Sequence, residues 1–168
     1  MYANRGNLYK NLNQYNKAFA DYNKAIQIDP ENLRFYINRG LLYHYLNQDN
    51  NALADWNKVI QSNPKYPLAY FNRGSLYYKQ KKYNKALSDY SKAIQLNPRY
   101  VESYNNRGNL YYNLRNYRKA IKDLTKVLSL SPSMWQSHQL LHLCYKNINE
   151  MQKAQYHLQK AQQLRQQH

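Results

Sequence analysis

The stretch Tyr70-Phe71-Asn72-Arg73-Gly74-Ser75-Leu76-Tyr77 recurs, with small changes, three more times in this chain. Each copy begins 34 residues after the one before it, and the other three occupy residues 2–9, 36–43 and 104–111. Prolines follow the same interval at Pro30, Pro64, Pro98 and Pro132. A fixed period of this length indicates a repeat protein. It divides the 168 residues into five units, 1–32, 33–66, 67–100, 101–134 and 135–168.

Two amphipathic helices are predicted in each unit, because apolar side chains recur every three to four residues in two separate runs. In the third unit the helices are expected at about 68–80 and 84–96, the second ended by Asn97-Pro98. Small residues let the helices approach closely, and they form two columns: Ala18, Ala52, Ala86, Ala120, Ala154 and Ala25, Val59, Ala93, Val127, Ala161. The sequence therefore predicts an all-α chain of about ten helices.

These columns resemble the tetratricopeptide repeat (TPR) over the whole chain. The resemblance implies a single array over residues 1–168, a right-handed superhelix of antiparallel helix pairs whose first helices line a concave groove. The fifth unit is degenerate, with His142 in place of glycine and no closing proline, and we expect it to act as a C-terminal cap. Met1, Leu8 and Leu12 match residues that elsewhere meet a preceding repeat. We therefore expect a fragment of a longer array, or end-to-end stacking on another copy.

One departure from the family concerns charge. An arginine precedes each repeated glycine, where the family usually has an apolar residue, and an aspartate follows 16 residues later in the second helix. We predict a structural salt bridge across each of four hairpins: Arg5–Asp21, Arg39–Asp55, Arg73–Asp89 and Arg107–Asp123. In the fifth unit both partners are replaced, by Leu141 and His157.

Catalytic chemistry has few candidates in this chain. The acids outside the predicted salt bridges are scattered, and no pair has a spacing suited to acid–base catalysis. Cys144 stands in a column of leucines, which indicates a core residue. His138 and His142 lie four residues apart, but no third metal ligand accompanies them. We therefore expect no catalytic site, no metal and no cofactor.

The amino-acid composition bears on where in the cell the protein is expected to work. Lysine and arginine number 25 against 9 acids, a formal net charge of +16, and a single cysteine excludes a disulfide scaffold. No apolar run approaches the ~20 residues that a bilayer requires, and the first residues lack a signal-peptide pattern. We expect an intracellular, cytoplasmic protein without a membrane span.

The groove is the predicted binding site. One asparagine per repeat stands directly before Arg-Gly, and we call this set the asparagine ladder: Asn4, Asn38, Asn72 and Asn106. Each amide offers a donor and an acceptor to the backbone of an extended peptide. The ladder is similar to the one lining the TPR domain of O-linked N-acetylglucosamine transferase, which implies sequence-tolerant recognition. The alternative is that these asparagines are only solvated.

An apolar anchor pocket is predicted beside the ladder, from Ile37, Leu41, Phe71, Tyr45 and Tyr78. The expected ligand is an extended peptide with one bulky apolar residue, and the expected function is a non-catalytic scaffold or adaptor for protein–protein interaction. The basic residues of a chaperone-type carboxylate clamp are missing in every register of this chain.

Two alternatives remain open at this stage. Lysines recur on the second helices, and we call the following set the lysine ridge: Lys24, Lys58, Lys92, Lys126 and Lys160. A second column, Lys17, Lys85, Lys119 and Lys153, shares that helical face. The ridge is suited to a polyanion, either an acidic protein or a nucleic acid, although no nucleic-acid motif is present. The other alternative is the substrate-selecting arm of a larger enzyme.

Overall fold

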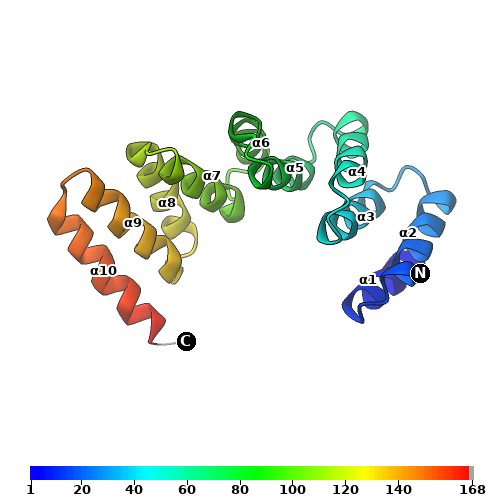
Figure 1. Ribbon diagram of the computed structural model, residues 1–168, viewed down its shortest axis with the longest axis horizontal. Coiled ribbons are helices and arrows are strands. Elements are labelled where there is room, and N and C mark those ends of the chain that lie inside the picture. The colour runs from blue at the N-terminus through cyan, green and yellow to red at the C-terminus, as the bar shows by residue number, and fades with distance from the viewer. Residues whose placement is uncertain (167–168) are drawn as a thin grey trace. The chain divides into compact units, whose positions relative to one another are not determined.

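A computed structural model describes residues 1–166, and these residues form ten α-helices and no strand (Figure 1). The helices are α1 (Tyr2–Asn11), α2 (Tyr15–Ile28), α3 (Leu33–Tyr45), α4 (Asp49–Ser62), α5 (Pro67–Lys79), α6 (Tyr83–Leu96), α7 (Val101–Asn113), α8 (Tyr117–Leu130), α9 (Trp135–Asn147) and α10 (Met151–Arg165). The predicted fold class is confirmed, and the two helices expected in the third unit begin and end within one residue of their predicted bounds.

Short turns connect the two helices of each repeat. The residue at the centre of each turn has a left-handed backbone, with φ between 58° and 61°, and these residues are Asn13, Asn47, Lys81, Arg115 and Asn149. Asparagine tolerates this conformation better than other non-glycine residues. Lys81 and Arg115 therefore carry more backbone strain than the asparagines at the equivalent places.

Close contact between paired helices depends on the small residues. Every residue of the two small columns is at most 5% exposed, which confirms their predicted place in the core. Gly40 of α3 lies against Trp56 of α4, and a Cβ atom on Gly40 would stand only 2.5 Å from Trp56 Nε1. Glycine is therefore required at this position by packing, and not by its backbone angles.

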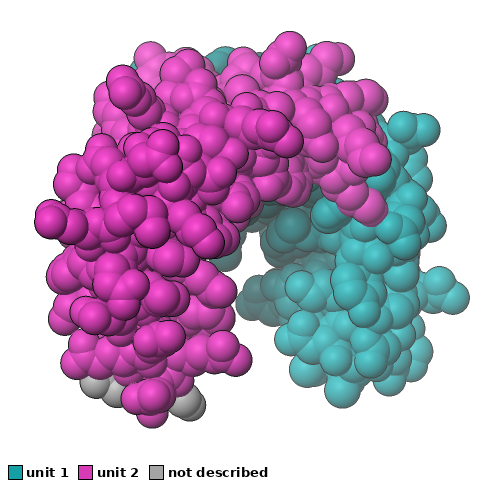
Figure 2. Space-filling model, turned by 60° about the vertical axis from the view of Figure 1, so that its left-hand side comes forward, with its two compact units in different colours: residues 1–76 teal, residues 77–168 magenta. Residues whose placement is uncertain are grey.

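Two compact units make up the chain, Met1–Leu76 and Tyr77–His168 (Figure 2). In unit 1, Tyr36 and Ile37 of α3 pack with Trp56 of α4 and with Ala69 and Leu76 of α5. In unit 2, Ala120 and Leu124 of α8 pack with Leu141 and Cys144 of α9. Each unit thus has its own apolar core, built where consecutive helix pairs meet. The division of the chain into a single array of five repeats stays a prediction.

Within residues 1–166, no helix combines the length and the apolar character that crossing a bilayer requires.

Candidate functional site

Arginine side chains connect the two helices of several repeats. Arg39 on α3 donates from Nε and Nη2 to the two carboxylate oxygens of Asp55 on α4, at 2.9 and 2.6 Å. The same two-pronged arrangement joins Arg5 to Asp21 and Arg107 to Asp123, at 2.7–2.8 Å. The structure thus brings together three of the four predicted pairs. The fourth, Arg73–Asp89, stays a prediction.

The aspartates of these pairs are buried, whereas the exposure of the arginines varies. The Asp55 side chain is 7% exposed and that of Arg39 is 19% exposed. The Arg5 side chain, by contrast, is 48% exposed. Hydrogen bonding to Arg5 lowers the pKa of Asp21, and hydrogen bonding to Asp55 raises the pKa of Arg39. Charge neutralisation of a buried carboxylate is therefore the main electrostatic task of these arginines.

Each arginine after the first also contacts the preceding repeat, which the sequence reasoning missed. Nη1 of Arg39 donates to Asn23 at 2.6 Å, Nη1 of Arg73 to Asn57 at 2.7 Å, and Nη1 of Arg107 to Ser91 at 2.8 Å. The three acceptors, Asn23, Asn57 and Ser91, stand in one polar column of the second helices, and Thr125 is its member in the fourth repeat. This recurring polar position was the feature of the sequence from which the contacts between repeats could have been predicted. The arginines thus connect repeats as well as helices.

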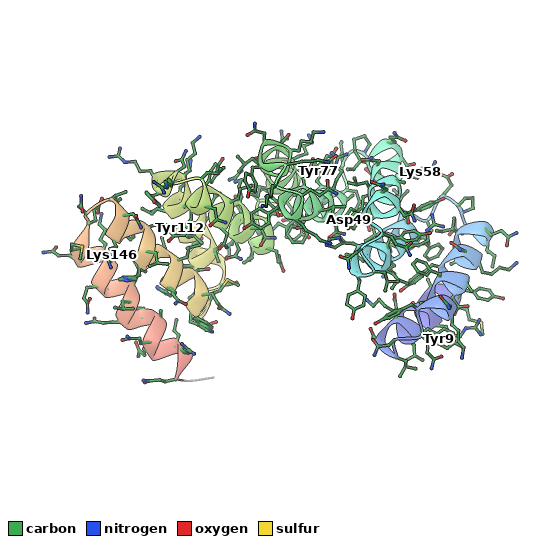
Figure 3. The ribbon with its side chains drawn as sticks, in the orientation of Figure 1. Tyr9, Asp49, Lys58, Tyr77, Tyr112 and Lys146 are labelled. Atoms are coloured by element: carbon green, nitrogen blue, oxygen red, sulfur yellow. The ribbon has the colours of Figure 1, made fainter. Side chains whose placement is uncertain are left out.

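Tyrosines surround these cations. The guanidinium carbon of Arg39 lies 5.6 Å from the ring centre of Tyr36 and 5.8 Å from that of Tyr43. On the other helix, ammonium groups lie 5.4–5.5 Å from ring centres in the pairs Lys17–Tyr9, Lys85–Tyr77, Lys119–Tyr111 and Lys153–Tyr145 (Tyr9 and Tyr77 are labelled in Figure 3). These four lysines therefore make cation–π contacts within their own hairpins, which limits their freedom to bind a polyanion.

The asparagine ladder is not uniformly exposed. Asn4 is exposed, Asn38 and Asn106 are half-buried, and none of these three makes a side-chain hydrogen bond within the described residues. Asn72 is only 6% exposed, and its buried Nδ2 has no hydrogen-bond partner in that part of the chain. It lies on the same helical face as Ala69 and Leu76, both in the core, which explains its burial. The prediction that Asn72 lines an open groove is wrong for this structure.

The predicted apolar pocket does not assemble as a set. Ile37 is 2% exposed and belongs to the core of unit 1, so its predicted place in the groove is wrong: it packs in the same cluster as Trp56 and Ala69. Phe71 is half-buried on α5. Tyr45 packs against Tyr15, with ring centres 5.6 Å apart.

Tyr78 belongs to unit 2, where its hydroxyl accepts a hydrogen bond from Asn113 Nδ2 at 2.8 Å. The apolar surface that remains on α3 consists of Leu41, 37% exposed, and Tyr45, 66% exposed. Asn38 lies three residues before Leu41, so these side chains share one face of the helix. We call Asn38, Leu41 and Tyr45 the α3 face.

Lysines of the ridge differ in their surroundings. Lys24, Lys58 and Lys126 are exposed, and Lys92 and Lys160 are partly buried (Lys58 is labelled in Figure 3). Glutamines three residues further on bind three of these ammonium groups, in the pairs Lys24–Gln27, Lys92–Gln95 and Lys160–Gln163 at 3.1–3.4 Å. Intrahelical partners therefore hold much of the ridge.

Histidines replace the salt bridge in the fifth unit. The Nδ1 atoms of His138 and His157 lie 2.8 Å apart, so one must donate and the other accept, which requires at least one neutral ring. Burial, followed by the charges of His138 and His142, lowers the pKa of His157 to about 4. Burial, followed by the charge of Lys160, also lowers the pKa of His138. His142 is engaged separately, with Nδ1 2.9 Å from the Ala154 carbonyl oxygen.

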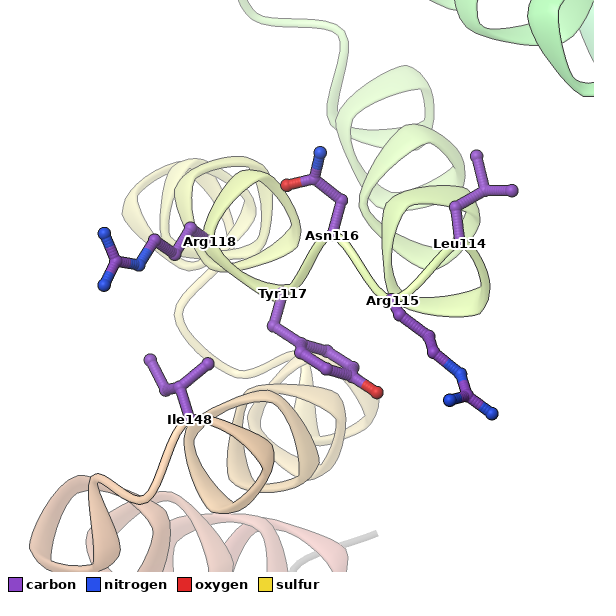
Figure 4. Close-up of a pocket in the computed structure, with 6 residues that line it drawn as sticks. All are labelled: Leu114, Arg115, Asn116, Tyr117, Arg118 and Ile148. Carbon is purple, nitrogen blue, oxygen red and sulfur yellow. The ribbon is translucent and has the colours of Figure 1, made fainter.

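A cavity of about 390 Å³ lies at the turns of unit 2 (Figure 4). Its walls are Leu114, Arg115, Asn116, Tyr117 and Arg118, from the α7–α8 turn and the start of α8, together with Ile148 after α9. The two guanidinium groups point away from each other in Figure 4. They therefore do not converge on a common ligand.

The paired helices, the small columns and the 34-residue period define a helical-repeat protein. A model of the tetratricopeptide repeat matches residues 67–100 and 101–134, and a second TPR model matches residues 6–47 and 42–81. The chain belongs to the tetratricopeptide repeat family.

Solved structures share this fold. A crystal structure of MamA has a TM-score of 0.84 at 23% identity, over 98% of this chain and 90% of that one. MamA from Desulfovibrio magneticus RS-1 also has a TM-score of 0.84, at 19% identity, over 99% of this chain and 94% of that one. YrrB, described as a TPR protein with an unusual peptide-binding site, has a TM-score of 0.78 at 22% identity, over 99% of this chain and 86% of that one. No curated protein matches the chain in sequence.

Proposed function

We propose that this chain is a non-catalytic protein-interaction module that binds an extended peptide segment along α1 and α3. The observation that carries the proposal is the contrast between neighbouring columns of the repeat. The arginines are held by ion pairs and hydrogen bonds, whereas the adjacent amides of Asn4 and Asn38 have no partner within the described residues. Membership of the TPR family supports the proposal, as does the peptide-binding site named for YrrB.

Backbone recognition follows from the geometry of unit 1. Asn4 lies on α1 and Asn38 on α3, and these two helices contact each other. Packed helices stand about 8–10 Å apart, and an extended peptide advances about 3.3 Å per residue. The two amides therefore meet backbone groups roughly three residues apart. Because each amide both donates and accepts, the peptide's own side chains contribute little to this part of the recognition.

The α3 face supplies the apolar part of the proposed site. Leu41 and Tyr45 lie one turn apart and expose apolar surface beside Asn38. Two or three amide hydrogen bonds at about 1 kcal/mol each and one buried apolar anchor at about 2–3 kcal/mol sum to roughly 4–6 kcal/mol. The expected dissociation constant lies between tens of micromolar and about 1 mM, which suits a transient adaptor.

Random-peptide display at physiological salt tests this proposal. The wild type is compared with Asn4→Ala/Asn38→Ala and with the matched control Asn16→Ala/Asn50→Ala, whose asparagines are exposed on α2 and α4. Enrichment of peptides with one large apolar residue by the wild type and the control, but not by the Asn4/Asn38 variant, supports the site. Enrichment of the same peptides by all three proteins contradicts it.

The salt dependence of binding distinguishes the proposed peptide site from the lysine ridge. Peptide binding through amides and an apolar anchor changes little with ionic strength, whereas binding to the ridge weakens steeply as salt rises. If all three proteins select acidic peptides and lose them at high salt, the ridge is the binding surface and the peptide proposal is refuted.

A further inference from the structure

A second cavity, of about 480 Å³, lies on the α7–α8 hairpin of unit 2. Tyr104 and Arg107 of α7 form one side, and Lys122, Thr125 and Lys126 of α8 form another. It is a depression open to solvent, and Lys122, Thr125 and Lys126 in its wall are exposed. None of its residues belongs to the α3 face, to α1 or to the asparagine ladder.

Positive charge dominates this cavity. Lys122 and Lys126 lie one helical turn apart, so their ammonium groups reach the same side of α8. Neither ammonium group has a hydrogen bond or an ion pair among residues 1–166. The one carboxylate in the wall is Asp123, and Arg107 occupies both of its oxygens at 2.7 and 2.8 Å. Two positive charges therefore remain without a counter-charge in the wall.

A free hydroxyl lies between the two lysines in sequence. Thr125 occupies the polar column whose other members, Asn23, Asn57 and Ser91, accept a hydrogen bond from the arginine of the next repeat. The fifth unit has Leu141 in place of that arginine, and Leu141 is buried in the core of unit 2. Thr125 is left without a hydrogen bond within the described residues. Loss of the fifth arginine thus leaves this hydroxyl available to a ligand.

The fourth repeat also differs from the others at two further positions of the cavity. Lys122 stands where the earlier repeats have Ala20, Ala54 and Ser88, and Ser129 stands where they have Gln27, Gln61 and Gln95. In the first and third repeats the glutamine binds the ridge lysine. Ser129 instead donates to the backbone carbonyl of Lys126, at 2.8 Å. The Lys126 ammonium therefore lacks the glutamine partner that holds Lys24 and Lys92.

We propose that this cavity binds a phosphate monoester. The ammonium groups of Lys122 and Lys126 and the Thr125 hydroxyl donate to the phosphate oxygens, which are strong acceptors of charged hydrogen bonds. The Tyr104 ring and the aliphatic stems of the lysines pack against the organic part of the ligand. The inorganic ion would leave this apolar part of the wall uncovered, which favours an ester.

Calorimetric titration of the full chain with phenyl phosphate at physiological salt tests the site, without any peptide present. The wild type is expected to bind one equivalent, and Lys122→Ala/Lys126→Ala to bind about tenfold more weakly or worse. The matched control is Lys24→Ala/Lys58→Ala, which removes the same charge from exposed lysines of unit 1. It should bind as the wild type does. Thermal unfolding of all three proteins verifies that the variants are folded.

Several results would overturn the site. Equal weakening in both double variants would assign binding to the general positive field of the protein. Absence of saturable binding, or binding of phenol as tight as that of phenyl phosphate, would equally refute it. Adenosine monophosphate and O-phosphotyrosine, titrated in the same way, distinguish a nucleotide from a phosphorylated side chain. The ligand that binds more tightly supports the proposed site if the Lys122→Ala/Lys126→Ala variant no longer binds it.

Discussion

Removal of both members of the Arg39–Asp55 pair is expected to cost no more stability than the more harmful of the two single removals. In Arg39→Leu, the Asp55 carboxylate loses two hydrogen bonds, at 2.9 and 2.6 Å, while its side chain is only 7% exposed. In Asp55→Leu, Arg39 keeps its bond to Asn23 but loses its counter-charge. In Arg39→Leu/Asp55→Leu no charge is stranded, and two apolar side chains meet.

The size of the effect follows from burial. Breaking a buried ion pair costs about 3–5 kcal/mol, and we lower this to about 2–4 kcal/mol per single variant because the Arg39 side chain is 19% exposed. The fifth unit shows that the arginine position accepts leucine, since Leu141 is fully buried there. The double variant is therefore expected to lose no more than the worse single variant, a coupling of about 2 kcal/mol or more.

Urea unfolding followed by circular dichroism measures the three free energies of unfolding. The Arg5–Asp21 pair is the internal comparison, because it has the same bidentate geometry but its arginine is 48% exposed. Its coupling should be clearly smaller than that of Arg39–Asp55. The explanation is refuted if the stability losses of Arg39→Leu and Asp55→Leu simply add in the double variant. It is also refuted if the coupling energies of the two pairs are equal.

Three further predictions concern packing, pH and reactivity. Gly40→Ala should destabilise the chain by roughly 1–2 kcal/mol net, because its Cβ would meet Trp56 Nε1 at 2.5 Å; an unchanged urea midpoint would contradict this. The His138–His157 pair has lowered pKa values, to about 4 for His157, so the unfolded chain binds more protons between the unfolded pKa near 6.5 and pH 4. The free energy of unfolding should therefore be constant above pH 6.5 and fall by roughly 1–3 kcal/mol toward pH 4, a range already reduced for the partial exposure of the two rings. If a His157→Phe variant loses stability with falling pH as steeply as the wild type does, the histidine pair is not the cause. Burial raises the pKa of Cys144 to about 11, so a disulfide reagent at pH 8 should label it only after unfolding; equally fast labelling of the native protein would disprove this.

Features that lie within one repeat were accessible from the sequence. The helix bounds and the small columns depend on residues of the same hairpin, whose spacing is repeated along the chain. The 16-residue offset between Arg39 and Asp55 is also an intrahairpin distance, because one helix and its turn bring these positions side by side. Local periodicity therefore determined the fold class and the geometry inside each helix pair.

Features that depend on the neighbouring repeat were decided only by the tertiary structure. Asn38 and Asn72 stand at the same position of their repeats, yet Asn38 is half-buried and Asn72 is buried. Ile37 belongs to the core although its position predicted a groove residue. The arginine bonds to Asn23 and Ser91 join successive repeats as well. A column in the sequence gives a residue's place on its own helix, but the area that the next helix covers depends on the side chains of both, and only packing decides it.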